Sequence, residues 1–129
     1  MNTLALIYVG FGGGFGAIMR YLAVAFVSKL NPTEFPYGTL LVNVVGCLLL
    51  GVWIASITVL TPAKAKDLHL LFAVGALGGF TTFSAFSFDL FFLAERGMYT
   101  QAALYAGASV LLSFVALIAG VMLVKLVAA

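Results

Sequence analysis

The chain has 129 residues, of which 64% are hydrophobic and only 8% are charged, and its mean hydropathy is +1.23. A soluble domain of this size is mostly surface and carries about 25% charged residues, so this chain has too little polarity to cover a water-facing surface. The net charge of +2, with no basic run, gives no reason to expect a nucleic-acid partner.

Charges and prolines divide the chain into four apolar segments, each longer than the roughly 20 residues that a helix needs to cross hydrocarbon. They extend from about Thr3 to Ser28, from Phe35 to Leu60, from near Pro62 to about Asp89 or Glu95, and from Gly97 to Val124. Thr61 and Pro62 are expected as the N-cap and the first residue of the third helix. The segments lack the strict alternation of a membrane β-barrel. We therefore predict an all-α membrane protein with one domain, residues 1–129, and four transmembrane helices.

Glycines recur at four-residue spacing in the first segment, GFGGGFGAIMR, as Gly10 with Gly14 and Gly12 with Gly16. This pattern lets helix backbones approach closely in lipid. The second segment repeats it with Gly38, Gly46 and Gly51. Four helices can hardly enclose a pore of their own, so this much close-packing surface favours an oligomer. The alternative, in which every glycine serves packing inside one chain, stays open.

Lysine and arginine are almost evenly divided between the two predicted sides of the membrane. The side of the two termini holds Lys64, Lys66 and Lys125, and the other holds Lys29 and Arg96, with Arg20 inside the first helix. Topology is normally set by a clear excess of these residues on one side. A chain with so little bias can insert in either orientation, and two oppositely oriented copies could then pair. The alternative is a protein that inserts in one orientation despite a weak charge signal.

Polar side chains lie at membrane depth in the second and fourth segments. Asn43 is near the middle of TLLVNVVG, and an unsatisfied amide in hydrocarbon costs about 2–7 kcal/mol. It either bonds a neighbouring helix or offers N–H groups to an ion. Tyr105, Ser109 and Ser113 lie at i, i+4 and i+8 in one hydroxyl stripe. The stripe favours a hydrated path along the helix over serines that form hydrogen bonds only to the backbone of their own helix. The lone cysteine, Cys47, is expected to serve packing.

The third segment contains GALGGFTTFSAFSFD, residues 75–89, which combines glycines and hydroxyls at mid-depth. Its three glycines and the pair Thr81-Thr82 are expected to break the helix near its middle. Carbonyl groups freed by such a break need protein, water or an ion as a partner. They are hard oxygen ligands, suited to an alkali cation.

Phenylalanines follow this predicted break. Phe80, Phe83 and Phe86 step by three residues and are expected on one helical face, where electropositive ring edges can face an anion. The membrane segments contain no paired acids and no metal-ligand cluster, so an intramembrane enzyme is not expected.

Together these motifs resemble the fluoride channel family of bacteria and archaea, the Fluc or CrcB proteins, over essentially the whole chain. The matching motifs are GxxxR from Gly16 to Arg20, then GTLLVNVVG, GxxGGFTTFSAF and YAGASxxxS, in this order. The chain departs from the family at Ala85, where Thr is common, and at Asp89, where Glu is common.

The resemblance implies a passive fluoride-selective channel of the cell (inner or plasma) membrane that exports the anion, and no enzyme. It implies an antiparallel homodimer with dual topology, two pores and surrounding lipid. A central structural Na⁺ would be held by the backbone carbonyls of Gly78 and Thr81. The implied ion-pathway residues are Asn43, Phe83, Phe86, Tyr105, Ser109 and Ser113, with Arg20 at the pore vestibule.

Other classes remain at this point. A small multidrug exporter also uses four short helices in dual-topology dimers, but it needs an acidic residue in the first helix, where this chain has Arg20. A helical subunit whose glycines and serines only pack would conduct no ion. A cation channel could use the broken helix as its filter.

Overall fold

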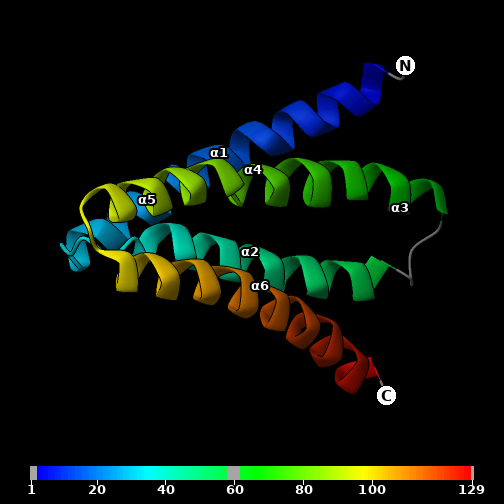
Figure 1. Ribbon diagram of the computed structural model, residues 1–129. Coiled ribbons are helices and arrows are strands. Elements are labelled where there is room, and N and C mark those ends of the chain that lie inside the picture. The colour runs from blue at the N-terminus through cyan, green and yellow to red at the C-terminus, as the bar shows by residue number, and fades with distance from the viewer. Residues whose placement is uncertain (1–2, 58–61, 129) are drawn as a thin grey trace.

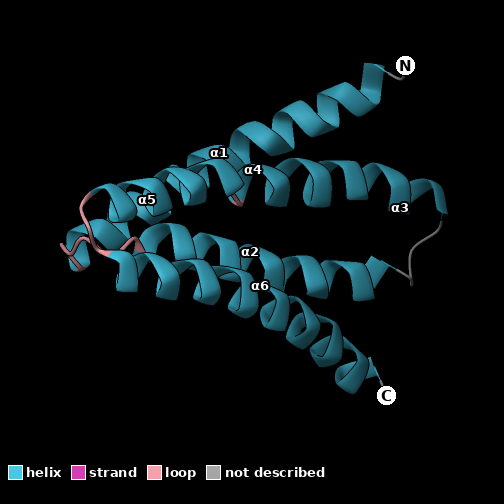
Figure 2. Cartoon of the chain, viewed as in Figure 1, coloured by secondary structure: helices cyan, strands magenta, loops and turns pink. Residues whose placement is uncertain are grey.

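The computed structural model describes residues 3–57 and 62–128, and the predicted N-cap Thr61 lies outside them. Among the described residues, all regular structure is helical (Figure 2). Three helices are continuous: α1 (Thr3–Leu30), α2 (Tyr37–Ser56) and α6 (Tyr99–Ala128). The third crossing consists of α3 (Pro62–His69), the π-helix η2 (Leu70–Leu77), α4 (Gly78–Phe80) and α5 (Phe83–Glu95).

Four stretches of the described chain are long and apolar enough to span a membrane: Thr3–Leu30, Tyr37–Ser56, Ala65–Glu95 and Tyr99–Ala128. This confirms the predicted four-helix membrane protein. Successive crossings run in opposite directions (Figure 1). The α1–α2 and α5–α6 connections lie at one end of the bundle, while the two chain ends and the start of α3 lie at the other (Figure 1).

The third crossing is interrupted at Thr81 and Thr82, as predicted. Thr81 has φ −81° and ψ 158°, and Thr82 has φ −153° and ψ 123°, so both are extended. A helix restarts after them because the Thr82 side chain caps α5 by accepting a hydrogen bond from the Ala85 N–H at 3.1 Å. Gly75, Gly78 and Gly79 all remain helical. The interruption is therefore at the threonines, and of the glycines before it Gly75 and Gly79 pack closely against the backbone of α1.

The prediction that Phe80, Phe83 and Phe86 share one helical face is wrong, because the break separates Phe80 from the other two. Phe80 ends α4, whereas Phe83 and Phe86 belong to α5. Because the two intervening residues are extended, the helical step of three residues does not continue from Phe80 to Phe83. Phe80 instead lines an apolar cavity together with Phe15 and Met19 of α1.

Close contacts between helices occur where a glycine meets backbone. A Cβ on Gly12 would overlap the carbonyl oxygen of Leu71, and a Cβ on Gly16 would overlap that of Ala76. Helix α1 therefore lies directly against η2. The α2 glycines Gly38, Gly46 and Gly51 also face neighbours within the chain, in α1, at the break and in α6.

Gly10 and Gly14 behave differently from these glycines. A Cβ at either position would meet no atom of this chain within 4 Å. The glycine pattern of α1 thus has one pair, Gly12 and Gly16, inside the protomer and another pair directed away from it.

Gly12→Ala is expected to lower the thermal unfolding midpoint in detergent markedly, since overpacking against backbone costs about 1–3 kcal/mol. The backbone at Leu71 cannot move as a side-chain end could. Gly107→Ala in α6, where an added Cβ would meet no atom of this chain within 4 Å, is the control and should change the midpoint far less. Equal midpoints for the two variants would contradict this packing.

Candidate functional site

Asn43 binds the backbone at the break. Its Nδ2 donates to the Thr82 carbonyl oxygen at 3.0 Å, and the Thr82 N–H donates to Asn43 Oδ1 at 2.8 Å. The side-chain amide thus pairs with both polar backbone groups of one residue. Of the two roles considered for Asn43, the bond to a neighbouring helix is the one observed. The amide carries a second N–H, which these two bonds do not use.

These bonds divert two backbone donors from the carbonyls that they would serve in a continuous helix. In a continuous α-helix the Thr82 N–H would serve the Gly78 carbonyl, and the Ala85 N–H would serve the Thr81 carbonyl. Here the Thr82 N–H is bonded to Asn43, and the Ala85 N–H is bonded to Thr82 Oγ1. The carbonyls of Gly78 and Thr81 have therefore lost their helical donors. They are the two carbonyls that the family resemblance implies as cation ligands.

A cavity of about 270 Å³ lies beside the break, and we name it the serine cavity. Its lining residues are Asn43, Cys47, Thr81, Thr82, Phe83, Phe86, Ser109, Val110 and Ser113. The structure therefore brings together five of the seven residues expected on an ion pathway. None of the lining residues is charged. Cys47, expected only to pack, is part of the wall; its position four residues after Asn43 places it on the same helical face.

Two hydroxyls in the serine cavity lack partners. Ser109 Oγ and Ser113 Oγ are buried, and neither makes a hydrogen bond of good geometry to another described residue, although the Tyr105 hydroxyl is close enough to interact with the Ser109 side chain. They therefore do not bond back to their own helix, which was the alternative to a polar track. A buried hydroxyl left unsatisfied costs about 1–3 kcal/mol, so these two groups are suited to a ligand that accepts hydrogen bonds.

Two phenylalanines form the opposite part of the wall. The rings of Phe83 and Phe86 have centroids 5.4 Å apart and are tilted by 44°. Phe86 is buried against Tyr105, whereas Phe83 is 76% exposed in the protomer. Phe83 thus lies where the cavity opens to the outside of the chain.

The remaining two predicted residues lie outside the serine cavity. Tyr105 is fully buried, and its hydroxyl donates to Asp89 Oδ2 at 3.2 Å. Arg20 lines a separate cavity of about 400 Å³, which we name the arginine cavity and which also contains Thr39, Thr82 and Asp89. The two serines of the hydroxyl stripe thus line the serine cavity, while its tyrosine is bonded to an acid.

Sequence reasoning left the role of Asp89 open and used Thr82 only as part of the predicted break. Asp89 accepts the Tyr105 hydrogen bond, and Thr82 borders both the serine cavity and the arginine cavity. Asp89 could have been found from the sequence, because it is an acid within an apolar segment, where ionisable residues are rare and functional. The signal for Thr82 was a cap residue before a new helical run.

Four membrane crossings, a broken third crossing and an uncharged cavity with amide and hydroxyl groups in its wall define a multi-pass membrane protein of the channel and transporter class. The chain matches the family model described as CrcB-like protein, Camphor Resistance (CrcB), over residues 7–121. The chain therefore belongs to the CrcB-like family. This confirms the resemblance and the expectation of a multi-pass plasma-membrane protein, and it places the chain among channels rather than enzymes.

Curated relatives match almost the full chain. A protein of Rhizobium johnstonii is 45% identical over 122 residues, which cover 95% of this chain and 97% of the relative. A protein of Nitrobacter winogradskyi is 42% identical over 128 residues, covering 98% and 100%. A protein of a Caulobacter species is 39% identical over 120 residues, covering 93% and 94%. All three are named fluoride-specific ion channel FluC.

Proposed function

We propose that this chain is a passive fluoride channel that carries cytoplasmic fluoride out of the cell down its electrochemical gradient. The observation that carries the proposal is the serine cavity, where two unpartnered hydroxyls, an amide and two ring edges surround one uncharged space. The names of the relatives at 39–45% identity support fluoride as the ion.

The cavity suits a small, strongly hydrated anion. Ser109, Ser113 and the remaining N–H of Asn43 can donate hydrogen bonds in place of water, and Phe83 and Phe86 can turn electropositive ring edges toward the ion. The N-terminal end of α5, at Thr82, adds a partial positive charge. Conduction needs binding that is favourable but weak and spread over several sites. The cavity wall provides this because it contains no cationic side chain that would trap the ion.

A passive path is sufficient for export. Fluoride enters a cell as neutral HF from an acidic medium and ionises inside, where the membrane potential then drives the anion outward. That potential supplies about 2.3 kcal/mol per elementary charge for each 100 mV. No chemical energy source is needed to lower the cytoplasmic concentration.

Fluoride efflux from liposomes tests this function. Liposomes that contain the purified protein and a potential are expected to release fluoride and to retain chloride, as measured with ion-selective electrodes. Protein-free liposomes are the control. The absence of fluoride release would contradict the function. Release that depends on the alkali cation rather than on fluoride would favour a cation channel.

We further propose that two oppositely inserted copies form a homodimer with two pores. Two observations support a second copy: the serine cavity opens to the outside of the protomer at Phe83, and Gly10 and Gly14 are directed away from the chain. Polar groups facing hydrocarbon are disfavoured, so a covering protein surface is expected there. The nearly even division of Lys and Arg supports opposite orientations.

A single reporter cysteine tests this topology. Thr33→Cys in a Cys47→Ala background places the only thiol in the α1–α2 connection. In intact cells a membrane-impermeant thiol reagent is expected to label about half of the copies, and the rest only after permeabilisation. Labelling of all copies, or of none, before permeabilisation would contradict dual topology.

The backbone carbonyls at the break also support a structural Na⁺ site in the proposed dimer. A monovalent cation is commonly held by unwound backbone carbonyls and by helix C-terminal ends. The helical donors of the Gly78 and Thr81 carbonyls are bonded to Asn43 and to Thr82 Oγ1, which leaves these two carbonyls available to a cation. These two residues of each copy would hold the ion, which would supply a fixed positive charge that disfavours the passage of cations.

A further inference from the structure

Cys47 provides the only sulfur atom among the lining residues of the serine cavity. It is the single cysteine of the chain, its thiol is free, and it shares the cavity wall with Asn43. The two residues are four positions apart in α2, so they share a helical face and lie about 6 Å apart along the helix axis. The thiol therefore lies one turn beyond the amide, toward the end of the bundle that carries the two chain ends (Figure 1).

Helix α6 places two hydroxyls in the same wall. It lies beside α2 and runs in the same direction (Figure 1), and a Cβ on Gly51 would overlap the carbonyl oxygen of Leu117. Ser109 is only 5% exposed, and both Ser109 Oγ and Ser113 Oγ are buried without a hydrogen bond of good geometry. The cavity that contains the Cys47 thiol thus also contains polar atoms available to a ligand.

The serine cavity has room for a metal ion beside the thiol. Its volume is about 270 Å³, and about 10–15 Å³ is enough for one water molecule. An ion and several of its waters therefore fit into it. Because none of the lining residues is charged, a cation held there would be the only full charge in the wall.

A thiol selects one class of cation. Thiolate is a soft ligand that favours soft metal ions, whereas hydroxyl and amide oxygens favour hard ones. In the part of the chain that the structure describes, no group of three His, Cys, Asp or Glu residues could hold a metal ion. Cys47 is therefore the residue at which a soft metal ion is expected to be retained.

We propose that Cys47 is a binding site for soft, thiol-seeking metal cations such as Hg²⁺, and that an ion bound there blocks conduction. The metal replaces the thiol proton: R–SH and Hg²⁺ give R–S–Hg⁺ and H⁺, with no change of oxidation state. The fixed positive charge then holds fluoride in the cavity, whereas conduction requires weak binding spread over several sites. This inhibition rests on the proposed fluoride conduction.

Fluoride efflux from liposomes, measured before and after the addition of Hg²⁺, tests the site. A unit charge about 4 Å from the anion, at an effective dielectric constant of about 20, holds it about a thousandfold more strongly. The rate of the unchanged protein is therefore expected to fall at least about tenfold. An excess of a small dithiol, which removes the metal, is expected to restore it. Intact-mass spectrometry is expected to show one mercury per chain, because the chain has one cysteine.

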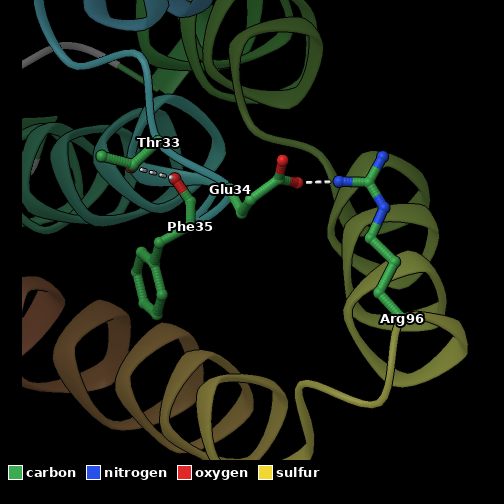
Figure 3. Close-up of polar contacts among 4 residues, drawn as sticks. All are labelled: Thr33, Glu34, Phe35 and Arg96. Carbon is green, nitrogen blue, oxygen red and sulfur yellow. Dashed lines mark hydrogen bonds and ion pairs between the residues drawn. The ribbon is translucent and has the colours of Figure 1, made fainter.

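Two control variants, each compared with its own rate before the addition, separate the site from other effects of the metal. Cys47→Ser has no soft ligand and is expected to bind no Hg²⁺ and to keep its rate. Thr33→Cys in a Cys47→Ala background moves the thiol to the α1–α2 connection, next to Glu34 and its ion pair with Arg96 (Figure 3). This variant is expected to bind Hg²⁺ but to keep its rate, since Thr33 does not line the serine cavity.

The inference is overturned if the unchanged protein binds Hg²⁺ and keeps its rate, or if it binds none. It is also overturned if Cys47→Ser or the relocated thiol loses as much of its rate as the unchanged protein does. Each of these results leaves the efflux before the addition intact. Absence of efflux before any Hg²⁺ is added would instead refute the proposed function itself.

Discussion

Asn43→Ala is expected to reduce fluoride efflux from liposomes by at least about tenfold. The substitution removes both hydrogen bonds to Thr82 and leaves its N–H and carbonyl without these partners. Each buried group left unsatisfied costs about 1–3 kcal/mol. A loss of that size changes the population of the conducting arrangement by about 5- to 150-fold. The amide N–H available to the ion is lost as well.

Cys47→Ala is the matched control for Asn43→Ala. Cys47 lies one turn further along the same face of α2 and lines the same cavity, but it makes no hydrogen bond to the break. We expect its efflux to remain close to that of the unchanged protein. Size-exclusion chromatography checks that both variants assemble alike. Normal efflux from an assembled Asn43→Ala protein would refute the role of this amide.

Phe83→Ile is expected to lower fluoride efflux by about tenfold, which corresponds to about 1.4 kcal/mol of lost ion stabilisation. Isoleucine is apolar like phenylalanine but has no electropositive ring edge. Because Phe83 is 76% exposed in the protomer, the substitution removes little packing within the chain. The expected loss therefore concerns the ion rather than folding.

Phe91→Ile controls for the loss of an aromatic ring from α5. Phe91 is 59% exposed on the same helix and lines neither the serine cavity nor the arginine cavity. Its efflux rate is expected to stay within about twofold of that of the unchanged protein, as for a surface substitution within about 0.5 kcal/mol. If both phenylalanine variants lose flux equally, the ring of Phe83 has no specific part in conduction.

The positions along the chain of several site residues could be predicted without a structure. Ser109 and Ser113 share a helical face at a spacing of four residues, so a regular α-helix necessarily aligns them. The break could be located near Thr81 and Thr82 because glycines and a cap residue are concentrated there. These features depend on local backbone geometry, which nearby residues largely determine.

Contacts between distant segments could not be predicted in the same way. Asn43 and Thr82 are 39 residues apart in sequence, and their pairing requires α2 to approach the break closely. Gly46 permits that approach, because a Cβ there would overlap Thr81 Cγ2. The hydrogen bond of Tyr105 likewise depends on Asp89, a residue of another helix.

By itself, the sequence determined that this is a membrane protein of four helices, because only helices satisfy the backbone within such long apolar segments. It also determined the family and the set of polar residues at membrane depth. Only the tertiary structure decided how those residues are used. The partner of Asn43, the freed carbonyls and the unpaired serines depend on which surfaces the close helix contacts bring together, and no local pattern encodes that choice.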